Sequence, residues 1–165
     1  MICNHVSFLD WLFVQAVAGR PVRFVMDHAF FKGWLLTWVL NTVRVIPIAE
    51  PKENRARTAD AYARIHEELA RGELICLFPE GRITRDGTLG PFKPGILKIL
   101  KKSPVPVVPI GIDGLWGSVA SFQGGPPFRK IPTRLWRKVT VRIGKMIPAA
   151  DASLARLRSE VEGLL

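Results

Sequence analysis

Short apolar runs alternate with helical segments along the 165 residues, and this alternation restricts the chain to few folds. The runs typical of strands lie at 22–26, 44–48, 74–78, 104–112 and 139–143, and helices are predicted at 8–18, 55–71, 96–102 and 153–165. Such a chain predicts an α/β fold with a mixed β-sheet covered by helices, because the connections that lack a helix permit antiparallel edges. Its length predicts a single domain over residues 1–165.

The chain is strongly basic, with 24 lysines and arginines against 14 acidic residues and a formal net charge of +10. This charge implies an acidic partner, which is nucleic acid, an anionic membrane or a phosphorylated substrate, and charge alone does not choose among them. A basic and aromatic cluster near the C-terminus suits either anionic lipid or RNA: Phe128, Arg129, Lys130, Arg134, Leu135, Trp136, Arg137 and Lys138.

The segment 29–40 is apolar on nearly every side but shorter than the roughly 20 residues that a helix needs to cross a bilayer. It predicts either a buried core helix or a helix in the membrane interface. In the second case Phe31, Trp34 and Trp38 would anchor it, with Lys32 at the level of the lipid phosphates.

A histidine and a carboxylate lie five positions apart in Asn4-His5-Val6-Ser7-Phe8-Leu9-Asp10, at a predicted junction between a loop and a helix. A neutral imidazole can take a proton from an alcohol, and a carboxylate on its other ring nitrogen fixes the tautomer and stabilises the imidazolium that forms. The same residues also fit a helix start, with Ser7 as N-cap and Asp10 facing the unpaired amides. Both interpretations remain open at this point.

A second polar segment, residues 77–87, follows the apolar run 74–78 and carries Glu80, Gly81, Arg82 and Arg85 in a turn. Ligands bind at strand ends in α/β sheets, arginine donates hydrogen bonds in pairs to phosphate, and glycine lets the backbone approach a ligand. Lys93 in the following loop is a further candidate for a phosphate. The alternative is a solvated turn with a surface glutamate.

Together the two segments resemble the glycerolipid acyltransferases typified by lysophosphatidic acid acyltransferase. The first block of that family, Asn-His followed by four residues and Asp, is matched by Asn4, His5 and Asp10. Its third block, Phe-Pro-Glu-Gly, is matched at 78–81, and an apolar block with a proline is similar to 105–110. The runs 24–28, 46–49 and 82–87 look most like the subgroup that reacylates lysophosphatidylethanolamine, in which the domain is often fused to an acyl-carrier-protein synthetase or a lysophospholipid transporter.

The resemblance implies a glycerol-3-phosphate acyltransferase-like fold and the transfer of an acyl chain to the free hydroxyl of 1-acylglycerol-3-phosphate or lysophosphatidylethanolamine. The donor would be a thioester, acyl-CoA or acyl carrier protein, with no other cofactor. His5 would be the general base and Asp10 would orient it, while amides near the helix start would stabilise the oxyanion. The remaining site residues would be a phosphate-binding group and a loop-shaping pair: Glu80, Gly81, Arg82, Arg85 and Lys93; Asn4 and Ser7.

The sequence departs from the family pattern at two places. An arginine commonly follows Glu-Gly by two positions, where this chain has Ile83, and the second block usually ends a strand with an arginine, where the comparable strand carries Arg44 earlier and closes with Ile48. Only Met1, Ile2 and Cys3 precede the Asn-His pair, so the first strand and any upstream membrane segment of the family are expected to be missing.

The expected partners are a lysophospholipid, an acyl thioester and an anionic membrane surface, with no nucleic acid, at the cytoplasmic face of the inner membrane. Metal-ligand spacing is not visible among three scattered histidines and two distant cysteines, Cys3 and Cys76, which are expected as small buried hydrophobic residues in a reducing compartment. Two other functions remain open, a basic lipid- or nucleic-acid-binding module and an inactive truncated acyltransferase.

Overall fold

The computed structural model describes residues 1–28, 44–49, 54–130 and 138–165. Its strands are β1 (Ile2–Cys3), β2 (Val22–Asp27), β3 (Ile46–Ile48), β4 (Leu74–Cys76), β5 (Pro109–Asp113) and β6 (Thr140–Ile143). Its helices are α1 (Asp10–Val17), α3 (Arg55–Ala70), α4 (Gly95–Lys102), the 3-10 turn η2 (Ala149–Asp151) and α5 (Leu154–Glu162). The predicted helix at 29–40 and the cluster residues Arg134, Leu135, Trp136 and Arg137 lie outside the described residues.

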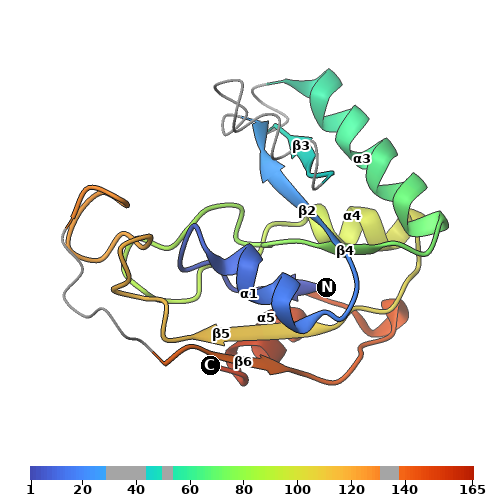
Figure 1. Ribbon diagram of the computed structural model, residues 1–165. Helices are drawn as coiled ribbons and strands as arrows, with labels where there is room; N and C mark the ends of the chain where they lie inside the picture. The colour runs from blue at the N-terminus through green and yellow to red at the C-terminus, as the bar shows by residue number, and fades with distance from the viewer. Residues whose placement is uncertain (29–43, 50–53, 131–137) are drawn as a thin grey trace.

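The strands form a mixed sheet in the order β3-β2-β4-β1-β5-β6, since a bridge between Ile2 and Leu77 joins the trio β3-β2-β4 to the trio β1-β5-β6. Neighbours from β3 to β5 run parallel, and β6 lies antiparallel to β5 at the edge (Figure 1). This arrangement confirms the predicted α/β fold with a mixed sheet, including the antiparallel edge strand reached without a described helix between β5 and β6.

Strand β1 has only two residues, yet it lies in the middle of the sheet. The amide of Ile2 donates to the carbonyl of Val108 at 3.0 Å, and the amide of Cys3 donates to that of Leu77 at 3.1 Å. Both side chains are fully buried. Ile2 and Cys3, too few for a strand of ordinary length, therefore still form one because neighbours on both sides fix their backbone.

Helices cover both faces of the sheet (Figure 1), and adjacent residues of β1, β2 and β4 pack into different cores. Cys3 packs with Val14 of α1, whereas its neighbour Ile2 packs with residues of α4 and α5. Residues of α3 pack against Val25 of β2 and against β4 on the same face as α4. This is an α/β/α sandwich, with α1 alone among the described helices on the face of Cys3.

The two cysteines are buried and free, as predicted. Burial raises the pKa of both thiols, that of Cys76 to about 12. Neither thiolate is populated at neutral pH, so both residues act as small apolar groups.

The predicted strand at 104–112 is shorter than expected. Regular pairing is confined to β5, and upstream of it only Val107 pairs, in an isolated antiparallel bridge with Ile147. Prolines at 104, 106 and 109 have no amide hydrogen to donate, which explains why the regular strand pairing is shorter than predicted. Among the described residues, none of the helices has the length and apolar character needed to cross a membrane.

Candidate active site

Two loops meet where adjacent parallel strands end. Asn4 and His5 directly follow β1, and the Phe78–Gly81 turn follows β4 by one residue. Because β1 and β4 are neighbours, their carboxyl ends bring the loops together, at the edge of the sheet where ligands of α/β proteins bind. The amide of Thr84 donates to the carbonyl of His5 at 2.8 Å, which joins the two loops.

His5 and Asp10 are in contact, as the spacing predicts. The distance between His5 Nδ1 and Asp10 Oδ2 is 2.8 Å, and the carboxylate is fully buried whereas 21% of the histidine side chain is exposed. An ionised carboxylate only accepts hydrogen bonds, so Nδ1 carries the proton and Nε2 keeps a lone pair. The imidazole also stacks on Phe78, with ring centroids 4.1 Å apart, so both its tautomer and its orientation are fixed for a general base.

The carboxylate of Asp10 also organises the start of α1. Its Oδ2 accepts from the amides of Val6 and Ser7 at 2.8 and 2.9 Å. The N-cap of α1 is Leu9, so the prediction of Ser7 as N-cap is wrong, although Ser7 Oγ accepts from the Leu9 amide at 3.2 Å. One oxygen atom of Asp10 thus accepts from the imidazole and from two backbone amides that precede α1.

The backbone amides from His5 to Asp10 are all occupied by acceptors of the protein itself. The amide of His5 donates to Glu80, that of Phe8 to the carbonyl of Ala120, and that of Asp10 to the carbonyl of Ser7. As described above, the amides of Val6 and Ser7 donate to Asp10 Oδ2, and that of Leu9 donates to Ser7 Oγ. These six amides therefore already have acceptors within the protein, and the expectation that an amide near the helix start stabilises the oxyanion stays a prediction.

Asn4 fixes the residue before the histidine. It is 2% exposed, and its carboxamide donates to the carbonyl of Ile112 at 2.9 Å while accepting from the Ile112 amide at 2.8 Å. These two bonds continue the pairing of β1 with β5 through a side chain. Asn4 thus holds the chain in line with the sheet up to the position of His5.

Glu80 points into the protein rather than toward a ligand surface. It is 6% exposed, its Oε1 accepts from the His5 amide at 2.7 Å, and its Oε2 accepts from the Gly90 amide at 2.8 Å. Burial raises the pKa of its carboxyl, and the hydrogen bonds from Gly90 and His5 act in the opposite direction. This placement differs from the sequence prediction, which put Glu80 with the groups that hold phosphate.

Three of the other predicted phosphate-binding residues lie on the outer side of the same loop. Gly81 has a left-handed φ of +69°, and a Cβ atom there would lie 2.8 Å from Lys93 Nζ, so the lysine side chain crosses directly over the glycine. Gly81, Arg82 and Lys93 are exposed, whereas Ile83, at the position where the family commonly has arginine, is only 7% exposed. The exposed cationic side chains beside Gly81 are therefore those of Arg82 and Lys93.

Arg85 lies against a different segment. Its guanidinium carbon is 3.6 Å from the centroid of the Phe122 ring, and the two residues line a cavity of about 310 Å³ with Gly125 and Pro126. Phe122 in turn packs near Phe8, with ring centroids 6.1 Å apart. The residues after β5 thus reach the His5 loop, which the sequence patterns did not indicate.

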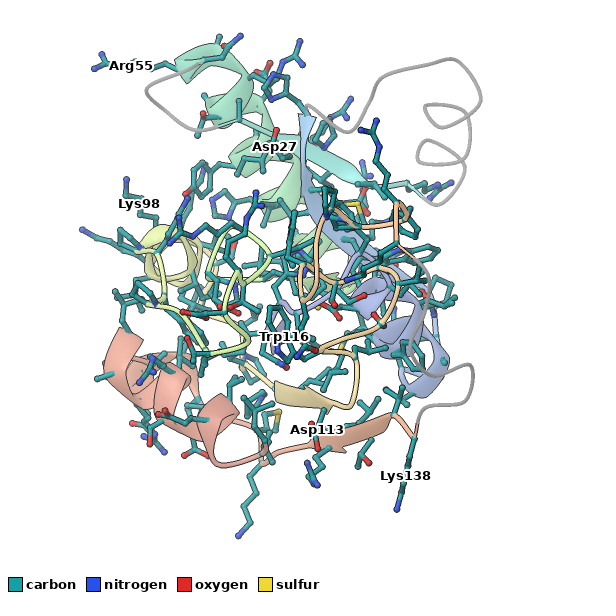
Figure 2. The ribbon with its side chains drawn as sticks, turned by 90° about the vertical axis from the view of Figure 1, so that its left-hand side faces the viewer. Asp27, Arg55, Lys98, Asp113, Trp116 and Lys138 are labelled. Carbon is teal, nitrogen blue, oxygen red and sulfur yellow. The ribbon has the colours of Figure 1, made fainter. Side chains whose placement is uncertain are left out.

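Two further side chains, Asp27 and Trp116, are labelled in Figure 2. Figure 2 shows Asp27 at the end of β2 beside α3, where its Oδ1 lies 3.2 Å from His28 Nδ1. Trp116, near the centre of the same view, packs over Gly87, since a Cβ atom on that glycine would lie 2.7 Å from the indole. The described residues contain no group of three or more histidine, cysteine or acidic side chains that could hold a metal ion.

The chain is similar to known proteins over a region that contains both loops. The family model named Acyltransferase matches residues 1–113. A chloroplast 1-acyl-sn-glycerol-3-phosphate acyltransferase of Brassica napus is 33% identical over 115 residues, which are 68% of this chain and 32% of that protein. A probable 1-acyl-sn-glycerol-3-phosphate acyltransferase of Mycoplasma pneumoniae is 27% identical over 126 residues, 73% of this chain and 46% of that protein.

The fold is shared with a solved structure. The crystal structure of the 1-acyl-sn-glycerophosphate acyltransferase of Thermotoga maritima is similar with a TM-score of 0.70 at 24% identity, over 99% of this chain and 61% of that one. The chain therefore spans from about a third to three fifths of the relatives named here. With its family model covering most of the chain and both loops of the site inside the matched region, this protein belongs to the Acyltransferase family.

Proposed function

We propose that this protein transfers a fatty acyl chain from a thioester to the free hydroxyl of a lysophospholipid. The observation that carries the proposal is the contact of 2.8 Å between His5 Nδ1 and the buried carboxylate of Asp10, on an imidazole that is partly exposed. Relatives named as 1-acyl-sn-glycerol-3-phosphate acyltransferases favour that lipid over lysophosphatidylethanolamine as acceptor.

In the proposed reaction, His5 Nε2 takes the proton of the acceptor hydroxyl while the hydroxyl oxygen attacks the thioester carbonyl. Asp10 stabilises the imidazolium that forms. The tetrahedral intermediate then collapses, the carbon–sulfur bond breaks, and the leaving thiolate takes the proton from the imidazolium. The acceptor supplies the nucleophile, so the reaction needs no acyl-enzyme.

The phosphate of the acceptor would bind on the exposed side of the turn after β4. Arg82 and Lys93 provide cations there, and Gly81 leaves room for close approach of the backbone. Arg85, held over Phe122, is a further cation near the same loops. We assign no contact with phosphate to Glu80, because its oxygens are occupied and its charge would repel the ligand.

An anionic membrane surface at the cytoplasmic face of the inner membrane is the proposed location of the reaction, as a lipid acceptor would require. Exposed apolar groups support contact with a membrane surface: Phe128 is 61% exposed within ring contact of Phe8, and Leu12 on α1 is 48% exposed. The exposed Arg129 adjoins Phe128 and would face lipid phosphates.

The test is release of free thiol from palmitoyl-CoA in the presence of detergent-solubilised lysophosphatidic acid or, separately, lysophosphatidylethanolamine, with palmitoyl-acyl carrier protein as a second donor. Release that needs both acceptor and His5 is expected. The matched control is His66→Ala, since His66 lies on α3 and contacts Ser103 rather than the site. Normal turnover by His5→Ala, or no turnover with any of the donor and acceptor pairs, would refute the proposal.

A further inference from the structure

The main chain of His5 is held on both sides by the loop that follows β4. Its amide donates to Glu80 Oε1 at 2.7 Å, and its carbonyl accepts from the Thr84 amide at 2.8 Å. The ring is held separately, by Asp10 and by Phe78. The position of the imidazole relative to a bound substrate therefore depends on the Glu80 loop as well as on Asp10.

Glu80 also fixes its own loop. Its second oxygen accepts from the Gly90 amide, ten residues further along the chain, at 2.8 Å. A Cβ atom on Gly90 would lie only 3.0 Å from Glu80 Oε2, so the absence of a side chain permits this contact. One buried carboxylate thus joins the segment after β1 to both ends of the turn 80–90.

We propose that Glu80 is a positioning residue, which sets the place of the His5 base through the backbone amide of His5 and does not bind the acceptor. The proposal rests on the acyl transfer proposed above. It deepens that proposal by separating the roles of neighbouring residues, because Glu80 would control turnover whereas Arg82 would control affinity for the acceptor phosphate.

Burial and charge favour this assignment over a ligand-binding role. Glu80 is 6% exposed, and each of its oxygens accepts a backbone hydrogen bond. A carboxylate beside a phosphate would be repelled by it, whereas Arg82 on the exposed side of the turn would attract it. Glu80 therefore faces backbone amides of the protein, whereas Arg82 faces the solvent side where the acceptor phosphate would bind.

Steady-state kinetics of Glu80→Gln and Gly90→Ala test the proposal. Glutamine has one acceptor oxygen and cannot serve both amides, and alanine at 90 pushes the carboxylate away without changing its charge. Glu80→Gln is expected to lose about 100-fold in kcat, as misplacement of a catalytic group by about 1 Å does. Gly90→Ala is expected to lose less, because the carboxylate has to give by only a few tenths of an ångström there. In both variants the KM for the acceptor is expected to stay unchanged within about twofold. Arg82→Ala is expected to show the reverse, a raised acceptor KM with kcat nearly unchanged.

The control is Asp86→Asn, which removes a carboxylate from the same turn. Asp86 accepts hydrogen bonds from Thr84 and Thr88 but has no contact with His5, so kcat is expected to stay near that of the unchanged protein. A raised acceptor KM with normal kcat in Glu80→Gln would overturn the proposal. A loss of kcat in Asp86→Asn as large as in Glu80→Gln would also overturn it, because it would indicate general disorder of the turn.

Amide hydrogen exchange followed by NMR gives a readout that does not depend on activity. The amides of His5 and Gly90 are expected to be protected in the unchanged protein and in Asp86→Asn, and to lose protection in Glu80→Gln. If the unchanged protein were inactive with all donors and acceptors, the acyl transfer would be refuted while this measurement would still decide whether Glu80 holds His5. Rapid exchange of the His5 amide in the unchanged protein would overturn the positioning role.

Discussion

Replacing Asp10 by asparagine should separate the charge of this residue from its hydrogen bonds. All three groups that Asp10 pairs with, His5 Nδ1 and the amides of Val6 and Ser7, contact the same oxygen, Oδ2. The carbonyl oxygen of an asparagine can take that place and accept from all three. The new amide nitrogen would occupy the position of Oδ1, a buried atom that has no hydrogen-bond partner among the described residues.

The expected loss of kcat in Asp10→Asn follows from the distance of 2.8 Å between Asp10 Oδ2 and His5 Nδ1. A full positive charge on the imidazole at that distance interacts with the carboxylate by about 6 kcal/mol at an effective dielectric constant of about 20. If about half of the charge has developed in the transition state, the loss is about 3 kcal/mol, or roughly 100-fold in kcat.

The assay is acceptor-dependent thiol release, with thermal unfolding to verify that Asp10→Asn remains folded. Asp113→Asn removes an exposed carboxylate at the end of β5 and serves as the matched control, expected to keep full activity. An Asp10→Asn protein that retains more than about a third of kcat would refute the electrostatic reasoning, because the hydrogen bonds alone would then suffice.

Three further predictions concern stability and membrane contact. Asn4→Ala leaves the buried amide and carbonyl of Ile112 without partners and should cost about 2–4 kcal/mol, seen as a fall in Tm of roughly 5–15 °C, whereas Asn54→Ala, which removes only the N-cap of α3, should cost about 1 kcal/mol. Hydrogen bonds from Thr88 and Thr84 lower the pKa of Asp86 from 3.8 to about 2, so this carboxylate stabilises the fold above pH 3.8 and its contribution is lost as the pH falls through about 2. Asp86→Asn should therefore be less stable than the unchanged protein at neutral pH, and the difference in urea midpoint should vanish near pH 2; a difference independent of pH would contradict this. Phe128→Ser should weaken binding to phosphatidic acid vesicles at all salt concentrations, and binding that is unaffected would exclude the exposed ring from the membrane contact.

Much of the fold follows from local patterns in the sequence. The apolar runs and amphipathic segments predict β2, β4, β6 and the helices α1, α3, α4 and α5 to within a few residues, since each contains enough residues for its period to be recognised. Strand β1 could not be predicted in this way, because two residues have no period and their extended backbone depends on β4 and β5. Local patterns also overestimate β5, where apolar residues are interrupted by prolines.

The candidate site was predicted in part. The contact between His5 and Asp10 follows from their spacing at a helix start, because a separation of only five residues leaves few relative positions for the two side chains. The role of Glu80 does not follow from spacing, since it and His5 are 75 residues apart and meet only because β1 and β4 are adjacent in the sheet. For the same reason the sequence could not show that a glutamate from the second loop and the carbonyl of Ala120 accept hydrogen bonds from two amides of the first loop.

The pairing of Asn4 with Ile112 and of Glu80 with His5 has a consequence for protein engineering. A designer who transplants only the heptad from Asn4 to Asp10 into a new scaffold would copy the histidine and its carboxylate but none of their external supports. The smallest transferable unit is three separate pieces of chain: the heptad, the turn from Phe78 to Gly90, and the backbone of β5 at Ile112. A scaffold that offers three adjacent parallel strands in the order β4-β1-β5 could receive them together.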